Sequence, residues 1–134
     1  MDVEFGGHGE HNTIAGGSVY VSSGGTASKT EITGGSLTVL SQGYVWKTTI
    51  NSGYLNVSGG TAFDTEVNSG GTANISSGAL ASGAVLNTSG SMYVWRGGTA
   101  TNAKVSSGGL YVASGGTATD LVWTPCIGDR KSVV

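Results

Sequence analysis

Short apolar pairs that skip one residue recur along the chain at a nearly constant interval. The pairs are Val19/Val21, Leu37/Val39, Leu55/Val57, Ala73/Ile75, Met92/Val94 and Leu110/Val112. Their second members are 18, 18, 18, 19 and 18 residues apart. Because side chains alternate between the two faces of a strand, each pair predicts a short strand with one buried face. The interval predicts stacked coils of a β-solenoid.

Two further apolar columns follow the pairs in each repeat. The first contains Ala27, Val45, Ala62, Leu80, Ala100 and Ala118, and the second contains Ile14, Ile32, Ile50, Val67, Val85 and Val105, with Trp123 in the next slot. Glycine pairs separate the columns, as expected at tight turns that need positive φ values. Three inward columns and two glycine corners in each repeat predict an all-β fold, a parallel β-helix of about six ~18-residue coils with two or three short strands each.

The repeats occupy residues 14–123, and the segments on either side differ from them. Residues 1–13 are expected to form an N-terminal cap or flank outside the repeat. Residues 124–134 have the character of a truncated or non-native tail. Its last six residues match the translation of a sequencing-adapter sequence, which indicates a gene fragment from assembled environmental reads.

Composition and charge narrow the class of function. The chain has 25 glycines, one proline, 10% charged residues and a formal net charge of −2. It has no basic stripe, so we expect no nucleic-acid partner. No apolar run is long enough to span a membrane, and no signal peptide precedes the repeats, so any export signal is expected outside this sequence. A single cysteine, Cys126, excludes an internal disulfide.

The repeat unit resembles that of AIDA-type autotransporter adhesins. The resemblance covers roughly residues 14–122 and rests on the order of glycine corners and apolar columns, as in Ser107-Gly108-Gly109-Leu110-Tyr111-Val112-Ala113-Ser114-Gly115-Gly116-Thr117-Ala118. It implies a right-handed β-helical passenger, displayed on a bacterial surface or secreted, that acts in adhesion or self-association. It also implies O-glycosylation by a dedicated glycosyltransferase at corner serines, for which the matching positions are Ser23, Ser58 and Ser114.

Outward-facing residues are the candidate contacts. Between the paired apolar positions lies a ladder of Tyr20, Thr38, Asn56, Asn74, Tyr93 and Tyr111. We favour structural stacking of this ladder, with contact to carbohydrate rings as the alternative. Trp46 and Trp95 are further exposed aromatic candidates, although they do not share one column. The expected partners are further copies of the protein, or glycans or proteins of host or other cells.

Three kinds of chemical site can be weighed against these contacts. His8 and His11 lie near Glu4 and Glu10, but a solvated cap is the favoured interpretation and we expect no metal site. Calcium-binding rolls require a recurring Asp after the glycine pairs, and none recurs. We expect no cofactor.

Carboxylates offer the remaining route to catalysis. Asp64 and Glu66, with Glu31 expected one coil earlier near the position of Glu66, are the closest approach to a paired acid and base. We favour a solvated corner and a non-enzymatic protein. A carbohydrate-active β-helix enzyme is the alternative.

Threonines recur at the second corner, namely Thr26, Thr61, Thr99 and Thr117 with Thr101 and Thr119 beside the last two. Because Tyr44 and Ala79 interrupt this column, an ice-binding solenoid is only a minor alternative. The sequence therefore predicts a non-catalytic repeat segment of a bacterial surface-exposed or secreted protein, used for adhesion, self-association or spacing.

Overall fold

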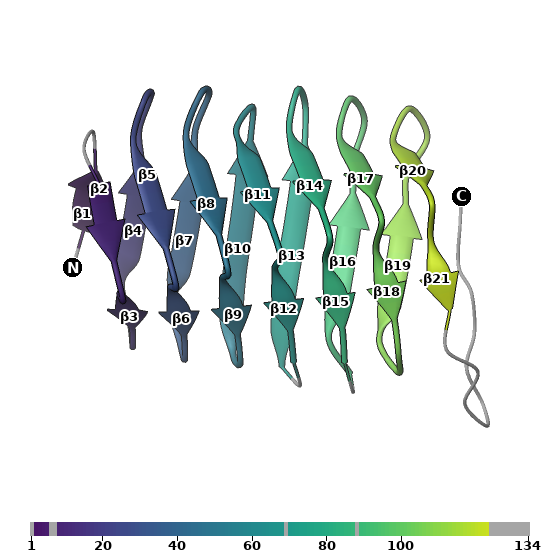
Figure 1. The fold of residues 1–134 in the computed structure, drawn as a ribbon, viewed down its shortest axis with the longest axis horizontal. Helices are drawn as coiled ribbons and strands as arrows, with labels where there is room; N and C mark the ends of the chain where they lie inside the picture. The colour runs from purple at the N-terminus through teal and green to yellow at the C-terminus, as the bar shows by residue number, and fades with distance from the viewer. Residues whose placement is uncertain (1, 6–7, 69, 88, 124–134) are drawn as a thin grey trace.

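A computed structural model describes residues 2–5, 8–68, 70–87 and 89–123. Within these residues every regular element is a strand, and the strands form three parallel sheets of seven strands each. Successive coils stack from the N-terminal to the C-terminal end, and each coil adds one strand to every sheet (Figure 1). The predicted all-β parallel solenoid is confirmed.

The three sheets are here called A, B and C. Sheet A contains β1 (Asp2–Phe5), β4 (Ser18–Val21), β7 (Ser36–Val39), β10 (Gly53–Ser58), β13 (Gly71–Ser76), β16 (Ser91–Val94) and β19 (Gly109–Val112). Sheet B contains β2 (His8–Glu10), β5 (Thr26–Ser28), β8 (Tyr44–Trp46), β11 (Thr61–Phe63), β14 (Leu80–Ser82), β17 (Thr99–Thr101) and β20 (Thr117–Thr119). Sheet C contains β3 (Thr13–Ile14), β6 (Glu31–Ile32), β9 (Thr49–Ile50), β12 (Glu66–Val67), β15 (Val85–Leu86), β18 (Lys104–Val105) and β21 (Val122–Trp123).

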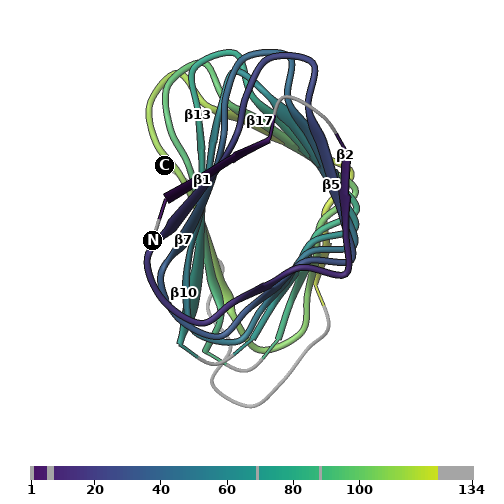
Figure 2. The same ribbon diagram turned by 90° about the vertical axis from the view of Figure 1, so that its left-hand side faces the viewer.

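The solenoid is right-handed. Viewed from its N-terminal end, the chain turns clockwise as it recedes, and the coils enclose a flattened oval cross-section (Figure 2). Neighbouring strands lie about 4.8 Å apart, so the seven coils form a short rod roughly 30 Å long.

The N-terminal segment joins this stack. We expected residues 1–13 to lie outside the repeat, but Asp2 is the partner of Ser18, His8 of Thr26 and Thr13 of Glu31. The described part of this segment therefore forms a first coil in the same register as the others. Residues 124–134, for which we predicted a non-native tail, lie outside the described residues.

The apolar pairs of sheet A form the centre of the core, as predicted. Every member of the six pairs is buried, and most have no exposed surface. The isoleucine and valine column of sheet C closes the core opposite the apolar pairs of sheet A. The inward side chains of sheet B are mostly alanines, which take up little room between them. The large inward residues of each coil stack on their equivalents in the next, because one coil alone cannot cover them.

Two positions in the predicted columns are wrong by one residue. Ala81, not Leu80, pairs with Ala62 and Ala100 in sheet B. Likewise Leu86, not Val85, is the inward partner of Val67 and Val105 in sheet C. Leu86 is fully buried, whereas Val85 faces outward and is only partly covered.

Unequal corners cause this shift. Four residues separate Val57 from Ala62 at the turn between sheets A and B, but five separate Ile75 from Ala81. The turn from sheet C to sheet A is correspondingly one residue longer after Val67. From Val57 to Ile75 the repeat length on sheet A is therefore 18, whereas from Ala62 to Ala81 on sheet B and from Val67 to Leu86 on sheet C it is 19.

Glycines stack at the turn from sheet C to sheet A, where six consecutive coils place one in the same register position: Gly17, Gly35, Gly53, Gly71, Gly90 and Gly108. A Cβ on Gly35 would lie 2.3 Å from the Gly17 carbonyl oxygen. Glycine is therefore required here for the close approach of successive backbones as well as for its positive φ of 79°.

A fourth buried column lies at the turn between sheets B and C and was not predicted. Thr30, Thr48 and Thr65 occupy it in three successive coils, and Ala84 and Ala103 continue it. The residue before each of them has a positive φ, and it is a non-glycine residue in most coils. Because these corners are polar and carry few glycines, the sequence gives little sign of a third turn.

Candidate functional site

The outward ladder of sheet A lies in the register that the sequence predicts. Tyr20, Thr38, Asn56, Asn74, Tyr93 and Tyr111 are consecutive Cα partners. In the middle of the ladder Asn74 Nδ2 donates to Asn56 Oδ1 at 2.9 Å. At its C-terminal end the rings of Tyr93 and Tyr111 are stacked, with centroids 4.9 Å apart and planes at 15°. Structural stacking therefore operates in this ladder.

Trp95 extends the stacked tyrosines into an aromatic platform made of Tyr93, Trp95 and Tyr111. Its ring lies 5.8 Å from that of Tyr93, with only 14° between the planes. Its indole Nε1 donates to Asn74 Oδ1 at 3.3 Å, which holds the ring toward the preceding coil. Trp95 is 47% exposed and Tyr111 is 38% exposed. The platform is thus an ordered aromatic surface that remains open to solvent.

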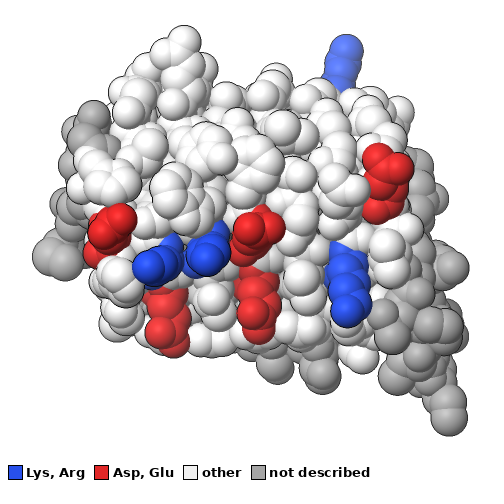
Figure 3. All heavy atoms as spheres, viewed as in Figure 1, with Lys and Arg blue, Asp and Glu red and all other residues white. Residues whose placement is uncertain are grey.

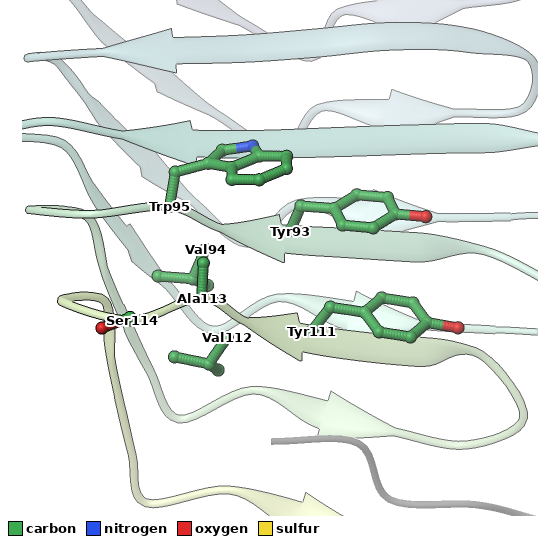
Figure 4. A pocket seen from close by; sticks show the side chains of 7 residues that line it. All are labelled: Tyr93, Val94, Trp95, Tyr111, Val112, Ala113 and Ser114. Atoms are coloured by element: carbon green, nitrogen blue, oxygen red, sulfur yellow. The ribbon is translucent and has the colours of Figure 1, made fainter. Parts of the chain in front are cut away.

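A hollow of about 230 Å³ adjoins the platform. Its lining residues are Tyr93, Val94, Trp95, Tyr111, Val112, Ala113 and Ser114 (Figure 4). The two tyrosine hydroxyls point the same way along the strands, while Ala113 and Ser114 lie toward the opposite end (Figure 4). Since Val94 pairs with Val112, the residue below Trp95 in the next coil is Ala113, which is too small to cover the indole.

The other two aromatic candidates lie elsewhere. Tyr20 shares the ladder, but Thr38, Asn56 and Asn74 separate it from Tyr93. Trp46 is on sheet B in a second cluster with Tyr44 and Phe63. The ring centroid of Tyr44 lies 5.7 Å from that of Trp46 and 5.2 Å from that of Phe63. The structure therefore brings together three of the five predicted aromatic contacts.

The three predicted glycosylation serines are exposed at the turn between sheets A and B. Ser23 and Ser114 both stand two residues after the last inward valine of their β-strand. Ser58 differs, because it is the last residue of β10 and its corner is one residue shorter. Ser41 and Ser77, which the sequence analysis did not single out, occupy the same corner position as Ser23 and Ser114 and are also exposed.

The carboxylates are not paired as expected. Glu31 and Glu66 are two coils apart, because Thr49 is the partner of both. Their backbones are therefore separated by roughly 10 Å rather than by one coil. Asp64 lies at the turn between sheets B and C with a φ of 51°. The predicted stacking of Glu31 one coil before Glu66 is wrong.

Both glutamates instead bind an asparagine ladder that was not predicted. Asn68 Nδ2 donates to Asn51 Oδ1 and Asn87 Nδ2 donates to Asn68 Oδ1, each at 2.8 Å. Asn51 also donates to Glu31 at 2.9 Å, and Asn87 to Glu66 at 3.1 Å. The signal was an Asn directly after the inward residue of three successive strands of sheet C.

At the N-terminal end His8 contacts the side chains of Thr26 and Glu10, with 3.3 Å between Nε2 and Glu10 Oε1. His11 is exposed at the turn between sheets B and C with a φ of 54°. Across the part of the chain that the structure describes, no three His, Cys, Asp or Glu side chains are grouped so that they could hold a metal ion.

Charged side chains are unevenly distributed. In the view of Figure 3 most of them form a band across the molecule, with one basic side chain standing apart at the upper edge. From residue 8 to residue 123, every charged side chain that the structure describes lies in sheet B, in sheet C or at the turn between them, except Arg96. Arg96 lies in the turn from β16 to β17, directly after Trp95.

The threonines of sheet B form a small array. Thr99 pairs with Thr117 and Thr101 with Thr119, so four threonines are neighbours in two coils. Leu80, rather than the expected Ala79, interrupts this column before Thr99. Tyr44 interrupts it again nearer the N-terminus. The array is therefore confined to the C-terminal end.

No helix in the described residues is long and apolar enough to cross a membrane. No protein-family model and no curated protein matches the chain. Among solved structures, one described as a TibC-catalysed hyper-glycosylated fragment of TibA matches with 22% sequence identity and a TM-score of 0.30. That match covers 99% of this chain and 84% of the other.

Proposed function

We propose that this chain is a non-enzymatic repeat segment of a bacterial surface-exposed or secreted protein, which acts in adhesion or self-association and holds its contact surface on a rigid rod. The observation that carries the proposal is the aromatic platform of Tyr93, Trp95 and Tyr111 on an uninterrupted parallel sheet. An exposed aromatic surface is a common feature of binding sites, because aromatic rings bury a large area with little loss of side-chain freedom.

The rod gives this surface a fixed position. Each coil is held to its neighbours by three backbone ladders, and side-chain ladders on the outer faces add further hydrogen bonds between coils. Contact residues on strands of such a sheet are positioned more precisely than residues on loops. A segment of this kind suits a protein that must hold a partner at a distance from a cell.

The exposed serines of the turn between sheets A and B are proposed acceptors for O-linked sugars added by a glycosyltransferase. Ser23, Ser58 and Ser114 carry this proposal, because an acceptor hydroxyl must be accessible on a backbone that an enzyme can approach. The intact mass of the protein purified from its own organism should exceed the sequence mass by whole sugar units. A mass equal to that of the unmodified chain would contradict this part of the proposal.

Surface exposure can be tested directly in the organism that carries the gene. An antibody raised against the folded chain should label intact cells or recover the protein from the medium. Protease added to intact cells should then remove the label. If the antibody detects the protein only after the cells are lysed, the proposal is wrong.

A further inference from the structure

The hollow beside Trp95 is lined almost wholly by apolar surface, and the function proposed above does not say which ligand it binds. We propose that it binds one pyranose ring that carries a carboxylate, such as a hexuronic acid residue of a glycan. The inference names a ligand for the adhesion role proposed above and rests on it.

The open face of the indole is the first argument. Trp95 is displaced toward the preceding coil by its hydrogen bond to Asn74, and Ala113 leaves its other face uncovered. Tyr93 and Tyr111 show that parallel rings stack along this ladder. A pyranose has an apolar C–H face that packs against the electron-rich face of an aromatic ring, so it would occupy the place that an aromatic residue at position 113 would fill.

The size of the hollow sets the size of the ligand. A cavity of about 150 Å³ holds a benzene molecule, whereas pockets for drug-sized ligands start at about 300 Å³. A volume of about 230 Å³ therefore fits one substituted six-membered ring. The Ser114 hydroxyl at one end and the tyrosine hydroxyls at the other can donate and accept hydrogen bonds at the rim of such a ring (Figure 4).

Charge decides which pyranose is favoured. A Cβ built on Gly115 would lie 2.7 Å from Arg96 Cγ, so the stem of Arg96 lies against the residue that follows Ser114. Arg96 is exposed, and the other charged side chains described from residue 8 onward lie on or between sheets B and C. Because Arg96 is exposed and directly follows the lining residue Trp95, its guanidinium would attract a carboxylate bound beside Trp95 and would oppose a cationic ligand, which aromatic rings alone would also accept.

The test is a titration of the ¹⁵N-labelled chain with methyl β-D-glucuronide and, separately, with methyl β-D-glucoside at pH 7. The indole N–H of Trp95 and the amides of Ala113 and Ser114 should shift with a dissociation constant on the order of millimolar for the glucuronide. Binding of the glucoside should be about five-fold weaker, because an exposed ion pair contributes no more than about this factor.

Four variants separate the elements of the site. Trp95→Ala should abolish both titrations, and Ala113→Leu should weaken both at least ten-fold by filling the hollow while Trp95 remains. The second change is tolerable in the fold, because Leu40 occupies the equivalent position in an earlier coil. Arg96→Gln should reduce glucuronide binding to the level of the glucoside. Trp46→Ala, on sheet B, should change neither titration.

Equal binding of the two sugars by the unmodified chain, no shift at Trp95, or shifts that Ala113→Leu leaves unchanged would each overturn the inference. Shifts that depend on protein concentration rather than on sugar would show instead that a second copy occupies the hollow. If the antibody labels intact cells and the titration fails, only the ligand is wrong. If labelling fails, the proposed surface role is wrong, whatever the titration shows.

Discussion

Replacement of Gly35 by alanine should destabilise the solenoid far more than the same change at the exposed Gly16 or Gly24. Gly35 has a φ of 79°, and a Cβ there would lie 2.3 Å from the Gly17 carbonyl oxygen and 2.8 Å from the Gly16 carbonyl carbon. Both atoms belong to the backbone of the preceding coil. The coil cannot yield locally, because the ladders of sheets A and C hold it in register on both sides of this turn.

Three terms contribute to the change in the free energy of unfolding. A non-glycine residue in the left-handed region costs about 1–2 kcal/mol. Forcing a methyl group into a filled site costs about 1–3 kcal/mol more. Alanine lowers the entropy of the unfolded chain and thereby returns about 0.4–1 kcal/mol. Gly35→Ala should therefore reduce the free energy of unfolding by roughly 2–4 kcal/mol.

Two other glycines separate these terms. Gly24 has a nearly identical φ of 78°, but a Cβ there would have no atom within 4 Å. Gly24→Ala should thus cost only about 1 kcal/mol. At Gly16 there is neither a positive φ nor a nearby atom, so Gly16→Ala should stabilise the chain by about 0.4–1 kcal/mol.

Urea unfolding followed by far-UV circular dichroism measures the series under identical conditions. We expect the midpoint concentrations to fall in the order Gly16→Ala, wild type, Gly24→Ala and Gly35→Ala. Midpoints are the safer comparison, since repeat proteins do not always unfold in two states. If Gly35→Ala unfolds with the same midpoint as Gly24→Ala, the close stacking of coils at this turn is not real and the reasoning fails.

Three further changes test the interior and the ladders. Asn68→Ala removes one donated and one accepted hydrogen bond of the asparagine ladder and should destabilise the chain by about 1–3 kcal/mol in urea unfolding. Thr48 has a buried hydroxyl with no hydrogen-bond partner among the described residues, so Thr48→Val should stabilise by about 1 kcal/mol in a thermal melt. Thr30→Val should not, because the Thr30 hydroxyl accepts a hydrogen bond from Asn12 at 3.4 Å. Leu86→Ala should cost about 2–5 kcal/mol in urea unfolding, and Leu80→Ala less than about 1 kcal/mol, because only Leu86 is fully buried.

For each of these substitutions one result would contradict the predicted change in stability. Ser106 stands at the end of the asparagine column, and Asn68→Ala should be clearly more harmful than Ser106→Ala. Equal effects would mean that the ladder contributes nothing. A Thr48→Val protein that melts below the wild type would show that the hydroxyl is satisfied, by water for example. A larger cost at Leu80 than at Leu86 would restore the register that the sequence first suggested.

The fold could be predicted because sheet A repeats with almost no variation. Its apolar pairs recur at intervals of 18 or 19 residues, and one face of each strand is buried, so a shift by one residue would expose the whole pair. The short strands of sheets B and C give no such check. Leu80 and Val85 were placed inward because they are apolar, while the one-residue difference between corners puts Ala81 and Leu86 there.

The candidate site was predictable only in part. The column of Tyr93 and Tyr111 follows from alternation in sheet A, but the position of Trp95 relative to them depends on its hydrogen bond to Asn74. The hollow depends on the contrast between Trp95 and Ala113 in neighbouring coils, which becomes visible only once the register is known. Sequence alone gave the residue types, and the stacking of coils gave their arrangement.

Contacts between residues one coil apart test the central claim most directly. A ¹⁵N-edited NOESY spectrum should contain Hα–H^N cross-peaks between strands that are consecutive in each sheet, as between Leu37 and Leu55 in sheet A. In sheet C the peaks should connect Val67 with Leu86 and Leu86 with Val105. Such a pattern establishes parallel coils in this register. Cross-peaks typical of antiparallel hairpins, or a connection of Val67 with Val85 in place of Leu86, would contradict it.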